Sequence, residues 1–561
     1  MDKQRLLLRY ILPFGFGVGL FVFIIVKAFA VQVTTDEAYT LTILTKETVW
    51  NLVSYESSYT NNHILNSLLC KLSFSLFGMD QMAGRLPNIL SFVLYFWFVW
   101  QFSRRFFADN FVGLMFVCVM LGNPYMIEFF SLARGYGMSF ALMMVSIYYA
   151  ARYTLEDVKR ALPISLLFAI LSVYAQFALL HFFLGLNILI FSYEVHKYVK
   201  SPKKIEDRNA QILRGVGTQA LGVLILGILV YAPFKAILKD NQISYYGSKN
   251  IWDDSIVSLI SRSLYGQGYF SADTVIVFKN LMVALFVFSI LNSVYKLIKT
   301  KENLIKNNNS QIEKNKKRIE KNNSLLIETE NAENDKSLLI KNNQLLIKNN
   351  ELYIKNNELL LTNNYSFVKN NKIKDPSVFS FILMISVFFV ITAQFYALGT
   401  QYVVDRTCLF LYPIIALTMP TVALFVGREK VWAKRLVALV FTVFCIWHVS
   451  RSSNMTHFSE WWFDKNTKEV LEIMKVEYQK MQVKRPLKVN TNCVMQPSFD
   501  YYYQEQHLDW LVEPFGWNNK VDTIKQYDFY YDLNDNWDAL KTRYDTLKSY
   551  DNGEYLLLKK K

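Results

Sequence analysis

The chain has 561 residues, of which 52% are hydrophobic and 16% aromatic, and its mean hydropathy of +0.16 is high for a soluble protein. Its net charge of +15 and pI near 9.2 would suggest nucleic-acid binding in a soluble chain. Here the basic residues lie in the loops between apolar runs, on alternate sides of successive runs. This pattern is typical of a multi-span membrane protein and argues against a nucleic-acid partner.

Runs of about 20 mostly apolar residues predict roughly eleven membrane-spanning helices. These lie near residues 10–31, 86–103, 111–127, 134–152, 161–177, 179–197, 213–233, 275–297, 377–397, 407–426 and 435–450. The pair 161–177 and 179–197 can also be read as one long helix. The run 64–77 is too short to span comfortably and is expected at the membrane interface.

The basic loops give the predicted orientation. Because Lys and Arg mark the cytoplasmic side, the N-terminus is expected inside and, with eleven spans, the C-terminus outside a cell membrane. Residues 10–31 are long enough to span and no A-x-A-like site follows, so no cleaved signal is expected. Four parts are predicted: a membrane module at 1–299 with a first outer loop at 32–85, an Asn/Lys-rich cytoplasmic loop at 300–374, further membrane helices at 375–450, and an outer domain at 451–561.

Directly after the first span, TTDEAYTLTIL places Asp36 and Glu37 side by side near the expected edge of the bilayer. Thr34 and Glu37 have the spacing of a capping box, and the following residues to about 53 would then form one amphipathic surface helix. Two functional interpretations stand beside the cap: a site for a hard cation, and a general base that takes a proton from an attacking group. The cap and the base are compatible.

Other charged and polar residues are expected on the same outer face, while the spans themselves are nearly free of charge. They are Glu56, His63, Arg85, Glu128, Arg134, Tyr136, Asp405 and Arg406. Three outer arginines run against the positive-inside trend. They could anchor the chain in the interface, but several arginines among several acids favour a phosphate site, because guanidinium binds phosphate oxygens in pairs. Tyr136 could equally be an interfacial aromatic residue.

The segment 300–374 repeats with period seven, as LIKNNQL, LIKNNEL and YIKNNEL from Leu339 to Leu359. Its apolar residues occur as consecutive triplets rather than at the 3-4 spacing of a coiled-coil seam, and Asn is a poor helix former. The repeat therefore favours an expanded segment in a tolerant loop. A helix that docks a partner is the alternative.

The tail predicts a small α/β domain. Residues 459–481 and 497–508 are typical of helices, and 487–494 and 527–533 of strands. Asp551-Asn552-Gly553 between two alternating runs predicts a β-hairpin. Trp461-Trp462 and Tyr501-Tyr502-Tyr503 could bind a glycan or a protein, although packing explains them as well.

The order of motifs resembles a known family. An Asp-Glu pair after the first span is followed by NNHILNSLL, then by G…RLPN opening the second span, then by ARGYGMSFAL opening the fourth. This resembles the GT-C membrane glycosyltransferases, in the branch of protein O-mannosyltransferases and aminoarabinose transferases. The resemblance covers residues 1–200 and, more weakly, 398–426. It implies a GT-C-like α-helical fold and a polyprenyl-phosphate-sugar donor used outside the membrane.

The resemblance also implies roles for individual residues. Asp36 would be the catalytic base, with Glu37 as its support or as an acceptor contact, and Arg85, Arg134 and Arg406 would hold the lipid phosphate. His63 matches the histidine of an HPPL-like stretch, although Ile64 and Leu65 replace its prolines. The expected partners are a polyprenyl-phosphate-linked sugar, membrane lipid, and an acceptor that is a glycan, lipid or protein. Tyr136 is a further candidate for substrate binding, with Glu56, Glu128 and Asp405 in support.

Alternatives stay open. No spacing demands a cofactor, but Asp36, Glu37, Glu56 and Glu128 could coordinate a divalent cation. A transporter or flippase of a lipid-linked glycan is the leading rival, although such proteins usually carry ionisable residues at mid-membrane and repeated halves, which this sequence does not show. A polysaccharide polymerase or ligase and a non-catalytic surface-assembly protein are further rivals.

Overall fold

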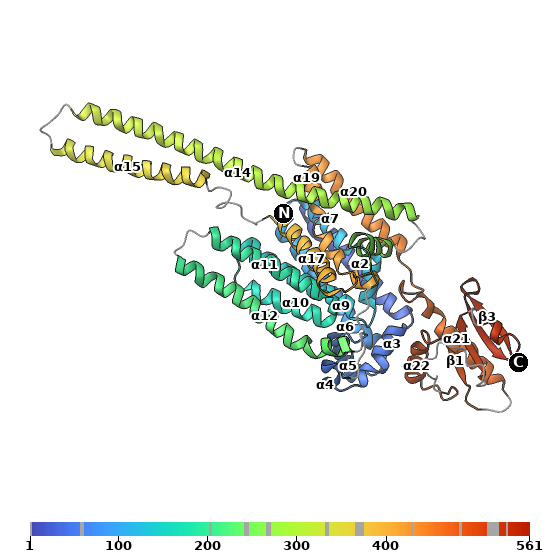
Figure 1. Cartoon of the computed structure of the whole chain (residues 1–561). Coiled ribbons are helices and arrows are strands. Elements are labelled where there is room, and N and C mark those ends of the chain that lie inside the picture. Colours follow the sequence, from blue (N-terminus) through green and yellow to red (C-terminus); the bar gives the residue numbers. More distant parts are fainter. Residues whose placement is uncertain are drawn as a thin grey trace.

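A bundle of helices makes up most of the chain, with two long helices projecting from one end and a small α/β domain at the other (Figure 1). The computed structural model describes residues 3–56, 61–200, 205–239, 246–264, 271–330, 336–364, 375–427, 430–481, 485–512, 527–533 and 537–561. The expected fold class, a mostly helical membrane protein with a small C-terminal α/β domain, is confirmed.

The described part of the first half of the chain is mainly helical. Its elements are α1 (Lys3–Leu6), η1 (Leu7–Ile11), α2 (Leu12–Ala30), α3 (Thr35–Thr42), η2 (Leu44–Lys46), α4 (Val49–Ser54), α5 (Ile64–Phe77), α6 (Gln81–Phe106), α7 (Asn110–Leu121), α8 (Pro124–Glu128), η3 (Phe129–Ser131), α9 (Gly135–Glu156), α10 (Ala161–Ala175), η4 (Phe177–Leu179), α11 (Leu180–Lys200), α12 (Ile205–Lys239), η5 (Trp252–Ile256) and α13 (Val257–Ser263). Helix α9 packs against both α6 and α10, so the apolar core lies along it.

The second half adds the projecting pair, the last bundle helices and the C-terminal domain. Its elements are α14 (Ala272–Glu330), α15 (Lys336–Asn364), α17 (Pro376–Leu398), η7 (Asp405–Cys408), α18 (Leu411–Ala416), α19 (Pro420–Val426), α20 (Val431–Ser452), η8 (Trp462–Asn466), α21 (Thr467–Lys480), β1 (Val489–Thr491), α22 (Gln496–Glu505), β2 (Phe529–Leu533), α23 (Trp537–Leu540), β3 (Tyr544–Tyr550), η10 (Asp551–Gly553) and β4 (Tyr555–Lys560).

The number of membrane spans differs from the expected eleven. Within the described ranges, seven helices are long and apolar enough to cross a membrane, or eight if the bent pair α7 and α8 is one span. The expected spans 134–152 and 161–177 do form helices, α9 and α10, but α10 has only 15 residues. Since α9 is buried over most of its length, protein contacts rather than lipid surround its polar residues. The count of eleven is therefore not confirmed.

The third expected span is broken where it approaches the charged residues. Helix α7 ends at Leu121, and the segment Pro124–Ser131 continues at an angle of 61° to it. Asn123 begins the new helix because its side-chain oxygen accepts the Met126 N–H at 3.1 Å, and Pro124 stands at the first helical position. The break brings this segment toward α3, where the Ala133 N–H meets Glu37 and the Arg134 side chain meets Asp36.

The amphipathic surface helix expected after Asp36 is not continuous. Helix α3 ends at Thr42, a short 3-10 turn follows, and α4 begins only after Thr48, whose side chain caps it by accepting the Asn51 N–H at 3.1 Å. The side-chain hydroxyls of Thr42 and Thr45 donate to the backbone carbonyls four residues earlier. A new cap and a run of threonines therefore divide the segment into three short pieces.

The Asn-rich repeat forms structure that the sequence did not suggest. In its described part, α14 and α15 lie side by side as a long hairpin (Figure 1). The contact follows a 3-4 spacing on each helix, in which Asn alternates with Ile or Leu: Asn308, Ile312, Asn315, Ile319 and Asn322 on α14, and Leu345, Asn349, Leu352 and Asn356 on α15. Residues 331–335 and 365–374 lie outside the described part.

Asn can occupy this seam because its amides pair across the hairpin. Asn315 donates to Asn356 at 2.9 Å and Asn322 donates to Asn349 at 2.8 Å. A buried amide is tolerated when a facing amide satisfies it. The consecutive apolar triplets argued against a seam of 3-4 spacing. In the structure only one residue of each triplet lies in the seam, whereas Leu346, Ile347, Tyr353 and Ile354 are exposed.

The C-terminal domain has the predicted helices and strands. Its sheet has the order β1-β2-β4-β3, with β1 and β2 parallel and the other pairs antiparallel. The predicted hairpin is confirmed: Tyr550 pairs with Tyr555 around Asp551-Asn552-Gly553, and all three turn residues have positive φ. Helix α22 packs on α3, which joins this domain to the start of the membrane module.

Candidate active site

The Asp-Glu pair lies at the start of α3, as the capping box predicted. Thr34 accepts the Glu37 N–H, and the Glu37 carboxylate accepts the Thr34 N–H at 3.0 Å. The cap fixes the first turn of α3, so the two neighbouring carboxylates point to different surroundings.

Glu37 is fully buried and is held by Arg85. The Arg85 Nε and Nη2 atoms donate to the two Glu37 oxygens at 2.7 Å each, and the Ala133 N–H donates to Glu37 at 2.7 Å. The remaining guanidinium hydrogens of Arg85 meet the backbone carbonyls of Ala28, Val31 and Gln32. This geometry places Glu37 and Arg85 in the packing between α2, α3 and α6. It leaves Arg85 away from the cavity described below, in contrast to the expected phosphate contact.

Asp36 instead meets the two other arginines. Its Oδ2 atom lies 3.0 Å from Arg406 Nη1 and 3.5 Å from Arg134 Nη2. The Asp36 side chain is 17% exposed and that of Arg406 is 30% exposed. The structure thus brings together Asp36, Arg134 and Arg406, which are up to 370 residues apart in sequence.

Arg134 is held rigidly. Its guanidinium donates to the Asn61 side chain at 2.6 Å, to the Asn61 carbonyl at 3.1 Å, and to Thr40 Oγ1 and the Asp36 carbonyl at 3.3 Å each. Its Nε–H is buried and has no hydrogen-bond partner among the described residues. Arg134 therefore ties the start of α9 to α3 while its charge faces Asp36.

Arg406 is presented by a turn that Asp405 holds. Asp405 has a φ of +51°, which is uncommon for a residue with a side chain. Its carboxylate accepts from Arg262 at 2.9 Å and from Ser258 at 3.0 Å, and its N–H donates to Ser258 at 2.7 Å. These contacts hold the Asp405 carboxylate against α13 and direct the next residue, Arg406, toward Asp36.

His63 is a neutral side chain in this site. Its Nδ1–H donates to the Ala175 carbonyl at 3.1 Å, which leaves the lone pair on Nε2. Burial, together with the charges of Arg134 and Arg406, holds the pKa of His63 well below its usual value. The imidazole packs edge-on against the Tyr136 ring. A neutral His63 can accept a hydrogen bond, but it adds no positive charge for a phosphate.

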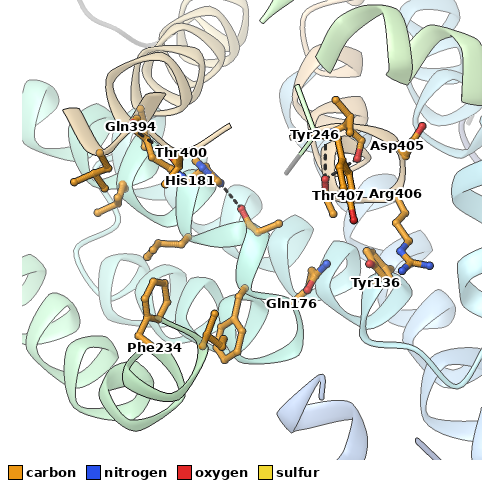
Figure 2. Close-up of a pocket in the computed structure, with 18 of the residues that line it drawn as sticks. Tyr136, Gln176, His181, Phe234, Tyr246, Gln394, Thr400, Asp405, Arg406 and Thr407 are labelled. Carbon is orange, nitrogen blue, oxygen red and sulfur yellow. Dashed lines mark hydrogen bonds between the residues drawn. The ribbon is translucent and has the colours of Figure 1, made fainter. Parts of the chain in front are cut away.

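His63, Arg134 and Arg406 lie at the polar end of a cavity of about 1080 Å³. Its polar wall includes Asn61, His63, Arg134, Tyr136, Asp405, Arg406 and Glu460, and its apolar wall includes Phe177, Leu184, Ile188, Phe234, Leu238, Phe389 and Leu398. Figure 2 shows Arg406 pointing toward Tyr136 at one side of the cavity, with Phe234 and Gln394 on the opposite side. Asp36 contacts the two arginines of the wall.

Two further acids stand apart from this centre. Glu128 is buried and pairs with Lys27 at 2.5 Å, while its second oxygen accepts the Ser459 N–H at 2.9 Å. Glu56 is exposed at the end of the first described part of the outer loop. The four acids considered for a cation thus have separate surroundings. No group of three His, Cys, Asp or Glu side chains suited to a metal occurs among the residues that the structure describes.

Two side chains around the site, Glu460 and Asp464, were not predicted from the sequence, and Trp461 was not expected to contact Arg406. Glu460 accepts from Tyr125 at 2.7 Å, lies 3.6 Å from Arg262 and 4.0 Å from Arg406, and lines the cavity. The Trp461 ring lies 5.2 Å from the Arg406 guanidinium, and Asp464 bonds to the start of α3. The Trp-Trp pair was the available signal, but nothing local indicated that this stretch folds back onto the membrane module.

No protein-family model matches the sequence, and no curated protein matches it significantly. The solved structures that it resembles include ArnT from Cupriavidus metallidurans. The form bound to undecaprenyl phosphate aligns at 9% identity over 98% of this chain and 97% of that chain, with a TM-score of 0.46. The apo form aligns at 9% identity over 96% and 97%, with a TM-score of 0.47. At this level of similarity, function has to be argued from the site residues of the chain itself.

Proposed function

We propose that this protein is an integral-membrane glycosyltransferase that moves a sugar from a polyprenyl phosphate to an acceptor outside the membrane. The observation that carries the proposal is the contact of Asp36 with both Arg134 and Arg406 at the polar end of a largely apolar cavity. A partly exposed carboxylate beside two guanidiniums provides a base and a phosphate site within reach of each other.

The cavity suits an amphiphilic donor. A polyprenyl tail can lie against the wall formed by α11, α12 and α17, since those side chains are mostly aliphatic or aromatic. The phosphate would then stand at Arg406, whose side chain is the more exposed of the two arginines near Asp36. The sugar would lie near Tyr136 and His63, and the neutral His63 can accept a hydrogen bond from a sugar hydroxyl.

The proposed step is a single displacement at the anomeric carbon. The phosphate would bind the Arg406 guanidinium beside Asp36 while Arg134 stays in place, and the partly exposed Asp36 carboxylate would be available to accept a proton. The acceptor hydroxyl or amine then gives its proton to Asp36 and forms the new bond to the anomeric carbon. The bond from that carbon to the phosphate oxygen breaks, and the phosphate leaves with the electron pair. The anomeric configuration inverts.

The arginines contribute most when the phosphate leaves. Negative charge grows on the phosphate as its bond to the sugar breaks, so guanidiniums that are already in place stabilise the transition state more than the bound donor. Arg134 is held by Asn61 and Thr40, and Arg406 by its turn, so little reorganisation is needed. Glu37 and Arg85 support this arrangement by fixing α3.

The same proposal assigns the domains and the orientation. The module at 1–299 and the helices at 375–450 form the membrane part, the first outer loop at 32–85 carries the base, and the domain at 451–561 lies on the acceptor side. The hairpin within 300–374 projects from the other end of the bundle (Figure 1) and would be cytoplasmic.

The test is sugar transfer by membranes that contain the wild type or Asp36→Asn at equal amounts of folded protein, supplied with labelled polyprenyl-phosphate sugars. The variant keeps the shape of the side chain and loses the base, so turnover should fall by roughly 10² to 10⁴. The matched control is Asp528→Asn, which changes a carboxylate of the C-terminal domain that pairs with Arg485. Unimpaired transfer by Asp36→Asn would refute the assignment of the base.

A further inference from the structure

The stretch between α20 and α21 folds back onto the membrane module. Residues 458–464, here called the strap, have the sequence FSEWWFD. Phe458 packs under the cations of Lys27 and Arg85, with ring-centre distances of 5.1 and 5.3 Å. The Ser459 N–H donates to Glu128 at 2.9 Å. The strap thereby contacts the two buried ion pairs Lys27–Glu128 and Arg85–Glu37.

The centre of the strap reaches the cavity itself. Glu460 lies on the cavity wall and accepts from Tyr125, and Trp461 lies under the Arg406 guanidinium. The Trp461 ring also packs edge-on against Phe129. The strap thus meets Arg406 through the Trp461 ring at 5.2 Å and the Glu460 carboxylate at 4.0 Å.

The end of the strap reaches the first turn of α3. Asp464 Oδ2 accepts the Thr35 N–H at 2.7 Å, and Thr35 Oγ1 lies 3.1 Å from both Asp464 oxygens. Ser498 Oγ donates to Asp464 Oδ1 at 2.8 Å. The Thr35 N–H is one of the first amides of a helix, which have no partner within the helix. Asp464 supplies that partner from 429 residues further along the chain.

Neighbouring contacts hold the same turn from the C-terminal domain. The Val33 N–H donates to Tyr502 Oη at 2.9 Å, and the Lys468 N–H donates to Gln32 Oε1 at 2.7 Å. Gln32 also donates to the Lys465 carbonyl. Asp36 directly follows Thr35, so the position of its carboxylate depends on how this turn is held.

We propose that Asp464 is a positioning residue for the base: through the Thr35 N–H it fixes the first turn of α3 and so sets Asp36 against Arg134 and Arg406. The inference rests on the proposed function for its kinetic consequence, but not for the contact itself. The C-terminal domain is then a required part of the active site, because the membrane module alone leaves the start of α3 without this partner.

The experiment compares the full-length wild type with Asp464→Ala and Asp464→Asn by hydrogen exchange and by transfer kinetics. Asp464→Ala removes the acceptor, so amide exchange in the peptide covering residues 33–42 should quicken by at least about tenfold. In the same variant kcat should fall by at least about tenfold, with the KM for the polyprenyl-phosphate sugar changed less than about threefold. Asp464→Asn keeps one acceptor oxygen and should recover most of both losses.

The matched control is Asp528→Ala. Asp528 belongs to the same domain, accepts a backbone N–H from Lys488 at 2.9 Å and pairs with Arg485, but it contacts the sheet rather than α3. It should change neither the exchange of residues 33–42 nor kcat. A similar effect in this control would show that loss of domain stability, rather than the Thr35 contact, is responsible, and would overturn the proposal.

Two other results would also overturn it. Unchanged exchange at residues 33–42 in Asp464→Ala would show that Asp464 does not hold the turn. Faster exchange with wild-type kcat would show that holding the turn does not position the base. If the wild type itself transfers no sugar, the proposed function fails, while the exchange measurement still decides whether Asp464 fixes α3.

Discussion

At the scale of single residues, the two neighbouring acids at the start of α3 have opposite surroundings. Glu37 is fully buried between Arg85 and the Ala133 N–H, whereas Asp36 is partly exposed beside Arg134 and Arg406. A helical step of one residue turns the two side chains by about 100°. The same short motif therefore supplies one structural carboxylate and one that is suited to chemistry.

Glu37→Gln should mainly destabilise the protein. The substitution leaves the Arg85 guanidinium buried without a counter-charge, and breaking such a pair costs about 3–5 kcal/mol. The apparent unfolding temperature in detergent should fall clearly, and the double variant Glu37→Gln/Arg85→Met should recover part of the loss. A fully stable but inactive Glu37→Gln would instead assign Glu37 a direct part in the reaction.

Arg406→Lys should mainly affect the reaction. Lys provides one point charge in place of the planar fork that binds two phosphate oxygens, so kcat/KM for the donor should fall by roughly tenfold or more. Stability should change little, because Arg406 is partly exposed. Arg451→Lys, at an exposed position near the end of α20, is the control. Equal kcat/KM in Arg406→Lys and wild type would contradict the phosphate assignment.

At the scale of elements, the α14–α15 hairpin shows how a polar repeat forms a specific contact. Alternating Asn and Ile or Leu give each helix a seam of 3-4 spacing, and the facing amides pair with each other. Buried Asn in a seam lowers stability but fixes the register, because a slip leaves amides without partners. The seven-residue repeat of the sequence thus corresponds to one period of the seam, which is one step of four residues and one step of three.

Asn315→Leu should loosen the hairpin, because it leaves the Asn356 amide without its partner at 2.9 Å. An unsatisfied buried polar group costs about 1–3 kcal/mol. Amide exchange across residues 343–358 of the full-length protein should quicken in the single variant and return toward wild type in Asn315→Leu/Asn356→Leu. Identical exchange in all three proteins would show that the pair does not contribute to the hairpin.

At the scale of the whole molecule, the C-terminal domain and the membrane module share one site. The strap places Glu460 and Trp461 beside Arg406 and joins Asp464 to α3. The contact of α22 with α3 widens the same interface. The C-terminal domain therefore contributes side chains to the site itself.

The buried Asp464 should make stability depend on pH. Burial raises the pKa of Asp464 to about 8, whereas in an unfolded chain the group ionises near about pH 4. Between these values the folded protein binds more protons than the unfolded one, so stability is greatest at the acidic end and falls as pH rises through about 8. Asp464→Asn removes this titration.

Unfolding temperatures of wild type and Asp464→Asn between about pH 5 and pH 8.5 check this dependence. The wild type should lose more stability than the variant as pH rises. Burial and the charges of Lys27 and Lys465 lower the pKa of His457 to about 4, which acts in the opposite direction below about pH 6.5. Because both proteins carry His457, its effect cancels in the comparison. Parallel profiles would contradict the predicted role of Asp464.

The features that the sequence predicted correctly depend on residues close together in the chain. The capping box of Thr34 and Glu37 spans three residues, and the turn at Asp551-Asn552-Gly553 joins adjacent strands. The long apolar runs predicted helices because burial of apolar side chains depends on composition over about 20 residues. The same runs place Asp36, Arg134 and Arg406 at the ends of apolar segments, which made a shared site a reasonable expectation.

The sequence by itself thus determined a helical membrane protein, an α/β tail and a set of acids and arginines from which a site could be built. Only the tertiary structure decided which acid meets which arginine: Glu37 takes Arg85, and Asp36 takes Arg134 and Arg406. It also brought the strap to the site and gave the Asn repeat its partner helix. Such pairings join residues that are tens to hundreds of positions apart in the chain. Their energies arise only when packing removes both partners from water. A local sequence pattern therefore cannot predict them.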